Sequence, residues 1–311
     1  MGKLSCQLIN KSFGSTQALK NISFEVSKGE IFGLIGPDGA GKTTLFRILT
    51  SLILADSGTA FVDGLDVVKD YAELRKHIGY MPGRFSLYQD LSVEENLNFY
   101  ATIFNTTIKE NYYLIKDIYQ HIEPFKHRRA GKLSGGMKQK LALSCALIHK
   151  PKVLFLDEPT TGVDPVSRKE FWEMLRRLKE DGITIVVSTP YMDEANLCDR
   201  IALIQNGQIF SIDKPANIVK QFSKKLFKIQ SDNNYLLLEE LRKNPQVESV
   251  FMFGDSLHVT LTIDNGQLTI DNENVIAGLT RNPLQLSIIN CQLDEIQPSV
   301  EDCFIAFNLK N

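Results

Sequence analysis

Hydrophobic and polar positions alternate within the first thirty residues, and a continuous apolar run follows them. Ile22, Phe24 and Val26 alternate with polar neighbours, which is typical of a half-buried strand. Residues 4–30 are therefore predicted to form strands that end in a turn at Lys28-Gly29-Glu30. The apolar run Ile31–Ile35 that follows predicts a short buried strand.

Helical periodicities and short apolar runs alternate from there to about residue 212. Ser92 and Glu95 have the spacing of a capping box ahead of a helix at Val93–Phe104. The other predicted elements are helices at 138–149 and 166–181, strands at 153–156 and 183–187, and a hairpin of strands 201–204 and 208–212 around Asn206-Gly207. This order predicts an α/β fold with a largely parallel core sheet and an antiparallel β portion built from the N-terminal strands.

The pattern changes again near residue 222. Strands are predicted at 227–230, 249–253 and 257–263, with a helix at 235–243 and a turn at Gly254-Asp255. We therefore expect two domains, one of residues 1–222 and a small α+β domain of residues 223–311.

Charge and composition narrow the class of protein. The chain has 311 residues, with 35 Lys and Arg against 37 Asp and Glu, and a net charge of −2. A nucleic-acid-binding domain usually carries a basic surplus, so this balance disfavours one. A basic run at residues 126–129 is interpreted as a solvated face. No apolar run approaches the ~18 residues of a membrane helix. The five cysteines form no CxxC pair, which favours reduced thiols in a soluble intracellular protein.

A glycine-rich segment lies between the strand predicted at Ile31–Ile35 and a helix. It reads Gly36-Pro37-Asp38-Gly39-Ala40-Gly41-Lys42-Thr43 and matches the pattern G-x-x-x-x-G-K-[ST]. Its glycines let backbone N–H groups turn toward an anion, and the helix adds the positive end of its dipole. Lys42 is expected to reach the β- and γ-phosphates of a bound nucleotide, and the Thr43 hydroxyl to bind Mg²⁺. The predicted cofactor-binding residues are Gly36, Asp38, Gly39, Ala40, Gly41, Lys42, Thr43 and Thr44.

Two carboxylates follow the apolar strand predicted at residues 153–156. Taken alone, an acidic pair at this position is more often a solvated loop or a helix cap. The phosphate-binding pattern upstream reverses that preference. Asp157 is expected to hold Mg²⁺ through water, and Glu158 to act as the catalytic residue that polarises the attacking water.

A second anion-binding helix start is predicted at Leu133-Ser134-Gly135-Gly136-Met137. Ser134 is suited to cap the helix, which leaves backbone amides exposed at its first turn. Two such helix starts in one chain suggest that one of them serves a neighbour's nucleotide.

With this segment the chain resembles the ABC-type ATPases, over residues 1 to about 222. Ser134, Gly135 and Gly136 look like the signature of that family, and the segment 161–164 looks like its D-loop, with Asp164 facing the partner site. The resemblance implies a P-loop fold of the ABC type with a helical subdomain, head-to-tail dimers, and ATP and Mg²⁺ as cofactors. Phe13 stands where the family stacks an aromatic on adenine; the alternative is a core aromatic.

The chain departs from the family at three positions. Gly83 stands where a Mg²⁺-ligating glutamine is usual, and Pro190 where a histidine usually contacts the γ-phosphate. Proline has no N–H to donate. Asp38 replaces a more usual asparagine. We therefore expect this chain's own site to bind ATP but hydrolyse it slowly, and to pair with a second ATPase subunit in an asymmetric heterodimer. A homodimer whose loops compensate is the alternative.

The stretches at residues 87–97 and 191–195 resemble the exporter branch, and the C-terminal segment resembles an accessory domain of such ATPases. This implies an ATPase subunit on the inner face of the cell membrane, held there by an integral membrane permease that contacts the loop after Pro82 and the next helix. A soluble non-transport ABC protein and a nucleotide-binding scaffold without catalysis are alternatives. The transported substrate is not readable from the residues, because its selectivity belongs to the permease.

Overall fold

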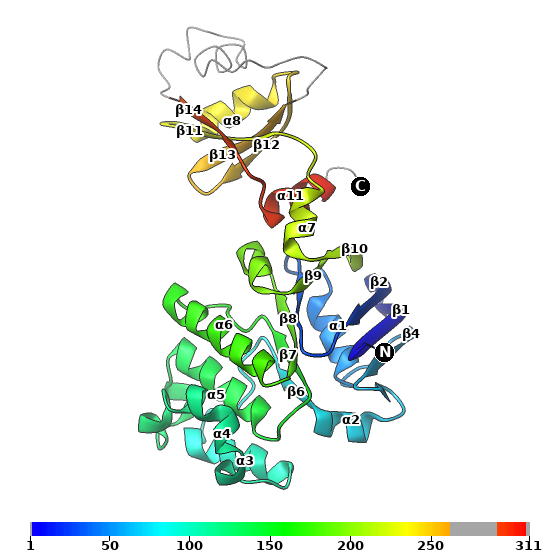
Figure 1. Cartoon of the computed structure of the whole chain (residues 1–311), viewed down its shortest axis with the longest axis vertical. Helices are drawn as coiled ribbons and strands as arrows, with labels where there is room; N and C mark the ends of the chain where they lie inside the picture. The colour runs from blue at the N-terminus through cyan, green and yellow to red at the C-terminus, as the bar shows by residue number, and fades with distance from the viewer. Residues whose placement is uncertain (1, 262–290, 309–311) are drawn as a thin grey trace. The chain divides into compact units, whose positions relative to one another are not determined.

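The computed structural model describes residues 2–261 and 291–308, and its contacts divide the chain into two units, Met1–Ile218 and Val219–Asn311 (Figure 1). The sequence places the boundary at residues 222–223, in the short segment between α7 (Pro215–Lys220) and β11 (Leu226–Ser231). Among the described residues, no helix combines the length and the apolar character that a membrane crossing requires.

A six-stranded sheet forms the centre of the first unit. Its order is β10-β9-β3-β8-β7-β6, and all neighbours are parallel except the β9–β10 hairpin. The strands are β3 (Ile31–Ile35), β6 (Ile78–Met81), β7 (Val153–Asp157), β8 (Thr184–Thr189), β9 (Arg200–Gln205) and β10 (Gln208–Asp213). β3 and β7 are buried along their whole length, which explains their unbroken apolar runs. The predicted α/β class with a parallel core sheet is confirmed.

The N-terminal strands form a second, antiparallel sheet, as predicted. Its order is β2-β1-β4-β5, with β1 (Leu4–Phe13), β2 (Thr16–Val26), β4 (Ser57–Val62) and β5 (Leu65–Asp66). The two sheets share one core, in which the rings of Phe24 and Phe32 stack at 5.3 Å and the ring of Phe46 meets that of Phe155 edge-on at 5.6 Å.

A partly exposed cluster of charged side chains also joins the two sheets. Lys3, His77 and Lys152 converge on Asp63, which follows β4, whereas His77 and Lys152 stand just before β6 and β7. Burial alone would raise the pKa of Asp63, but the hydrogen bonds from Lys3, Lys152 and His77 outweigh it and lower that pKa to about 2. The carboxylate is therefore ionised throughout the neutral range and fixes the β4–β5 turn against the core sheet.

The helices of the first unit occupy the sequence between the strands. They are α1 (Lys42–Leu49), α2 (Tyr71–His77), α3 (Val93–Ile103), α4 (Ile108–Tyr119), α5 (Gly135–Leu147) and α6 (Pro165–Glu180), with 3₁₀ turns η1 (Glu123–Phe125), η2 (Ala130–Lys132) and η3 (Met192–Leu197). The predicted capping box at Ser92 and Glu95 is formed. α3 and α4 both pack on α5, which in turn contacts β6, so these three helices form a helical subdomain (Figure 1).

The second unit is a four-stranded antiparallel sheet with helices. Its order is β12-β13-β11-β14, from β11, β12 (Val247–Phe253), β13 (Ser256–Leu261) and β14 (Cys291–Ile296); its helices are α8 (Asn234–Arg242) and α11 (Val300–Asn308). Leucines of α8 pack on one face of the sheet. His258 on β13 bonds to Asp302 on α11 at 2.7 Å. The strand predicted at 257–263 matches β13, and its last two residues lie outside the described residues.

Candidate nucleotide-binding and catalytic site

The glycine-rich loop turns sharply between β3 and α1, and two of its glycines are required by close backbone contacts. A Cβ atom on Gly36 would lie 2.1 Å from the carbonyl oxygen of Ile204 on β9. Gly41 has a φ of 104°, and a Cβ there would lie 2.6 Å from the carbonyl oxygen of Ala18. No other residue fits either position without moving a neighbouring strand. The loop is therefore packed against both sheets at these two positions.

Lys42 opens α1, and its ammonium group lies within this loop. The side chain is 3% exposed, and Nζ donates to the carbonyl oxygens of Gly36 at 2.8 Å and of Pro37 at 3.0 Å. The same Nζ lies 3.3 Å from Oε1 of Glu158. The glycine-rich loop and the acidic strand end, which are over a hundred residues apart in the sequence, thus meet at one point.

The two carboxylates stand where β7 ends. Asp157 is the last residue of the strand and is 2% exposed. Its Oδ1 accepts a hydrogen bond from the Ser188 hydroxyl at 2.5 Å. Glu158 has a φ of 50°, in the left-handed region that few residues other than glycine adopt, and this turn directs its carboxylate toward Lys42.

The donor set at this point suits Mg²⁺. That cation is usually bound by one or two carboxylates, together with substrate phosphates and water. Asp157 offers a carboxylate of which one oxygen is engaged by Ser188, and Thr43 follows Lys42 on the first turn of α1. In the part of the chain that the structure describes, no cluster of three or more His, Cys, Asp or Glu residues could hold a metal by protein ligands alone.

Gly83 and Pro190 both lie beside the acidic strand end. A Cβ atom on Gly83 would be 3.0 Å from the carbonyl oxygen of Asp157, so this position borders the carboxylates although it carries no side chain. Pro190 directly follows β8, the parallel neighbour of β7. Neither residue supplies a polar side-chain group, as the sequence indicated.

Glu194 is a buried centre of hydrogen bonds that sequence reasoning missed. Its side chain is 1% exposed, and it accepts from the hydroxyls of Thr160 at 2.7 Å and Thr189 at 2.6 Å. Arg168 on α6 donates to the same carboxylate through Nε and a terminal nitrogen, at 3.2 and 3.0 Å. The local sequence offered no cue, because Glu194 follows the exposed Asp193 in a segment that also contains an asparagine.

The signature segment, residues 134–136, lies at the start of α5. It is close to the D-loop and separate from the glycine-rich loop. Ser134 caps the helix by accepting from the Met137 N–H at 3.3 Å, as predicted. Cβ atoms added to Gly135 and Gly136 would lie 3.3 Å from the Gly162 carbonyl oxygen and 3.2 Å from the Ser167 hydroxyl. Bulkier residues at these positions would therefore press on the D-loop and on α6.

Asp164 caps α6. Its carboxylate accepts from the N–H groups of Val166 at 3.1 Å and Ser167 at 3.0 Å. These bonds, led by the one from Ser167, lower the pKa of Asp164. A contact of Asp164 with a partner site stays a prediction.

Phe13 is not a core residue, so the alternative interpretation of this aromatic is wrong. Its ring is 51% exposed at the end of β1, and the Lys11 ammonium lies 5.4 Å from the ring centroid. An exposed face is what adenine stacking requires, and that role stays a prediction.

The basic run 126–129 is partly exposed, and both Lys126 and His127 lie within 4 Å of Glu94.

Comparison with known proteins places these features in context. The family model described as "ABC transporter" matches residues 19–161. The chain is 39% identical over 293 residues to the probable multidrug ABC transporter ATP-binding protein YbhF of Escherichia coli, covering 93% of this chain and 48% of that protein. The chain thus spans about half the length of this relative.

Two further similarities cover complete cassettes. The Nod factor export ATP-binding protein I of Rhizobium sp. is 34% identical over 311 residues, with 98% of this chain and 97% of that protein covered. Among solved structures, a dimeric ATP-binding cassette in a post-hydrolysis state with bound ADP and Pi matches with a TM-score of 0.61 at 25% identity, over 68% of this chain and 98% of that one.

Proposed function

The chain belongs to the family of ABC transporter ATP-binding proteins, and from that premise we propose that it energises export through a separate membrane permease. Proteins of this family are ATPases. The observation that carries the ATPase part of the proposal is the 3.3 Å approach of Lys42 to Glu158, because it joins a phosphate-binding loop to a carboxylate that can act on water. The export part rests on the exporter relatives.

We assign the roles in the nucleotide site by the chemistry of each residue. Lys42 and the backbone N–H groups of the glycine-rich loop bind the β- and γ-phosphates. Glu158 accepts the proton of the attacking water. Thr43 and Asp157 would hold Mg²⁺, which supplies positive charge to the phosphates when it is bound. Phe13 offers an exposed ring to adenine.

Gly83 and Pro190 make this chain's own site slow in hydrolysis. Compared with the family pattern, Gly83 lacks a Mg²⁺-ligating side chain and Pro190 lacks a side-chain donor to the γ-phosphate. The loss of one transition-state hydrogen bond alone costs on the order of 10²–10³ in rate. Binding rests mainly on Lys42 and backbone amides, which are in place. The site is therefore suited to hold ATP more than to turn it over.

The intact signature segment supports an asymmetric heterodimer. Ser134 accepts from the N–H of Met137, and the N–H groups of Gly135 and Gly136 at the helix start have no partner within the helix. In a head-to-tail dimer, this helix start completes a nucleotide site on a second ATPase subunit. Such a partner would carry the glutamine and histidine that this chain lacks.

The heterodimer predicts unequal effects of two substitutions. In the reconstituted complex, Gly135→Asp should lower steady-state ATPase activity by at least about 10-fold, because it places a negative charge at the partner's phosphates. Glu158→Gln should lower it by less than about 2-fold, because it alters the slow site. Both are measured as ATP turnover at saturating ATP, with Gly254→Asp in the second unit as the control for a surface glycine.

Equal losses from both substitutions would favour the homodimer instead, since each site then needs both residues. ATPase activity of the isolated chain, unaffected by any membrane subunit, would favour a soluble non-transport protein. No turnover in the complex, with ATP binding retained, would indicate a nucleotide-binding scaffold.

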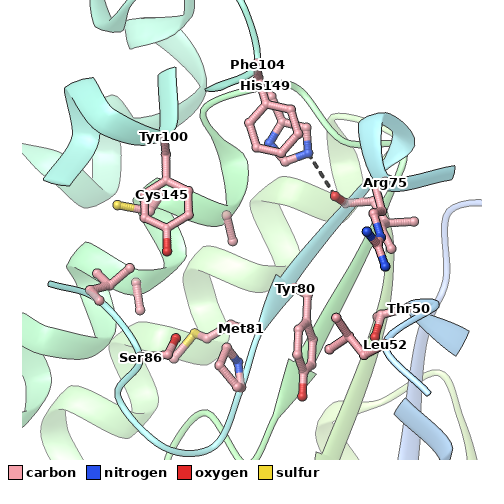
Figure 2. A pocket seen from close by; sticks show the side chains of 15 residues that line it. Thr50, Leu52, Arg75, Tyr80, Met81, Ser86, Tyr100, Phe104, Cys145 and His149 are labelled. Atoms are coloured by element: carbon pink, nitrogen blue, oxygen red, sulfur yellow. Dashed lines mark hydrogen bonds between the residues drawn. The ribbon is translucent and has the colours of Figure 1, made fainter. Parts of the chain in front are cut away.

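An apolar groove of about 230 Å³ between β6 and the helical subdomain supports permease docking (Figure 2). It includes the loop after Pro82 and residues of α3 and α5, and the labelled side chains of Tyr80, Tyr100 and Cys145 all line it. The loop and the following helix are the elements that the sequence assigned to this contact. We propose that a segment of the permease occupies this groove and holds the chain at the inner face of the membrane.

Tyr80 connects this groove to the acidic strand end. It lies on β6, where it pairs with Phe155 of β7. Burial and the negative charge of Asp157 raise the pKa of Tyr80 to about 12, so the phenol stays protonated at neutral pH. Tyr80 is thus a groove-lining side chain that also lies within the electrostatic influence of the proposed Mg²⁺ ligand.

Two exposed leucines in one loop allow the docking proposal to be tested. Leu52 lines the groove, whereas Leu54 does not, and they are 52% and 64% exposed. Leu52→Glu should abolish most of the stimulation of ATPase activity by the permease, because it places a charge in an apolar contact. Leu54→Glu should leave it within about 2-fold of the unaltered protein. Stimulation that survives Leu52→Glu contradicts docking in this groove.

A further inference from the structure

Ser188 lies directly beside the acidic strand end, on the neighbouring strand. β7 and β8 are parallel, and their register pairs Asp157 with Ser188. Ser188 is fully buried, so water does not compete for its hydroxyl group. Its environment leaves the hydroxyl two kinds of partner, a carboxylate and a backbone N–H.

The hydroxyl of Ser188 contacts both acidic residues at once. It donates its single hydrogen to Oδ1 of Asp157 at 2.5 Å. The same oxygen accepts from the backbone N–H of Glu158 at 3.2 Å, and the Ser188 carbonyl oxygen accepts from that N–H at 3.0 Å. One side chain therefore orients the Asp157 carboxylate and restrains the backbone of Glu158.

Both effects act on the proposed chemistry. Because Ser188 occupies Oδ1, the other carboxylate oxygen of Asp157 is the one left to face a cation. Glu158 has a φ of 50°, and the two hydrogen bonds from its N–H hold it in this uncommon conformation, from which its carboxylate reaches Lys42. Gly83 and Pro190 supply no side-chain hydrogen bond in this region.

We propose that Ser188 is a positioning residue, which fixes Asp157 for Mg²⁺ and Glu158 for water. This inference rests on the proposed function of the nucleotide site. The role predicts that loss of the hydroxyl weakens the response of ATP binding to Mg²⁺, while binding of free ATP, which depends on Lys42 and the loop amides, changes little.

The test titrates the full chain with a fluorescent ATP analogue, with and without Mg²⁺. In Ser188→Ala, we expect the gain in affinity on adding Mg²⁺ to fall by about 10-fold, and the affinity without Mg²⁺ to stay within about 2-fold. Ser188→Thr keeps a hydroxyl and should restore most of the gain. Ser188→Cys keeps the shape of the side chain but has a weaker donor, and it should fall between them.

Ser144 provides a matched control. It is also fully buried, and its hydroxyl donates to the Lys140 carbonyl oxygen at 2.8 Å within α5. Ser144→Ala should lower stability to urea without changing the Mg²⁺-dependent gain. A gain that is unchanged in Ser188→Ala, or equally reduced in Ser144→Ala, overturns the positioning role. An unaltered chain that shows no ATP binding overturns the proposed function itself, and this role with it.

Discussion

Replacing Lys42 with alanine is expected to weaken ATP binding by this chain about 10²–10⁴-fold. The ammonium group is the only side-chain cation within the glycine-rich loop, where it is held by the carbonyl oxygens of Gly36 and Pro37. Contacts to two phosphate groups are charge-assisted hydrogen bonds, each contributing about 1.5–3 kcal/mol. Their combined loss gives the expected factor.

Equilibrium titration with a fluorescent ATP analogue measures this loss. Lys243→Ala is the matched control, because that lysine is exposed in the second unit and pairs only with Glu240 at 2.9 Å among the described residues. Its affinity for ATP should equal that of the unaltered chain. Near-normal affinity in Lys42→Ala would contradict the role given to Lys42, since the backbone amides of the loop would then suffice for binding.

The same substitution separates the two nucleotide sites of the proposed heterodimer. Lys42→Ala removes ATP from this chain's own site, yet the signature segment at Ser134–Gly136 is untouched. If the partner's site does not require ATP in both sites, hydrolysis there should therefore persist in Lys42→Ala. Gly135→Asp has the opposite pattern, with ATP binding by this chain retained and turnover lost.

The core of the first unit could be predicted because local pattern and position in the sheet agree there. Strands buried on both faces read as continuous apolar runs, as at Ile31–Ile35 and Val153–Leu156. Both strands are parallel, so the residues that follow them meet at the same edge of the sheet. The convergence of Lys42 and Glu158 follows from that geometry, and the observed 3.3 Å separation agrees with it.

Interactions that depend on distant segments could not be predicted in the same way. Asp63 draws its partners from residues 3, 77 and 152, and nothing in the pattern around it signals them. Phe13 shows a different difficulty, because an aromatic after an alternating strand suits a core as well as a ligand face. Only its 51% exposure excludes the core.

Ser188 and Glu194 illustrate why the immediate surroundings of the carboxylates needed a structure. Ser188 contacts Asp157 because β8 is the parallel neighbour of β7, and strand order is not encoded in local periodicity. Glu194 gathers partners from three segments, each unremarkable in sequence. The motifs locate the groups that act on the nucleotide, whereas the groups that hold them in place are selected by topology.

Glu194→Ala is expected to lower the free energy of unfolding of the first unit by about 3–5 kcal/mol. The substitution leaves the hydroxyls of Thr160 and Thr189, both at most 1% exposed, without their acceptor. It also removes the ion pair between Arg168 and the buried carboxylate of Glu194. Removing one member of a buried ion pair has a cost of this size, because the remaining groups stay desolvated and unpaired.

Two neighbouring substitutions separate this effect from a general loss of charge. Asp193 pairs with the same arginine at 3.1 Å but is 72% exposed, so Asp193→Ala should lower stability by less than about 1 kcal/mol. Glu194→Gln keeps the size and one acceptor oxygen and should lie between the two. Stabilities are obtained from urea unfolding, followed by fluorescence of the single tryptophan, Trp172, which is buried on α6 and therefore reports on the first unit.

The position of these bonds gives the substitution a functional effect as well. Thr189 precedes Pro190 at the end of β8, Thr160 leads into the D-loop, and Arg168 lies one turn into α6. Glu194 thus ties the two segments that border the acidic strand end to the helix capped by Asp164. Glu194→Gln should therefore lower ATP turnover in the reconstituted complex, measured at a temperature where the variant remains folded. Its binding of ATP by the loop around Lys42 should not fall. Equal stabilities of Glu194→Ala and Asp193→Ala would show that the buried carboxylate contributes no more to stability than its exposed neighbour.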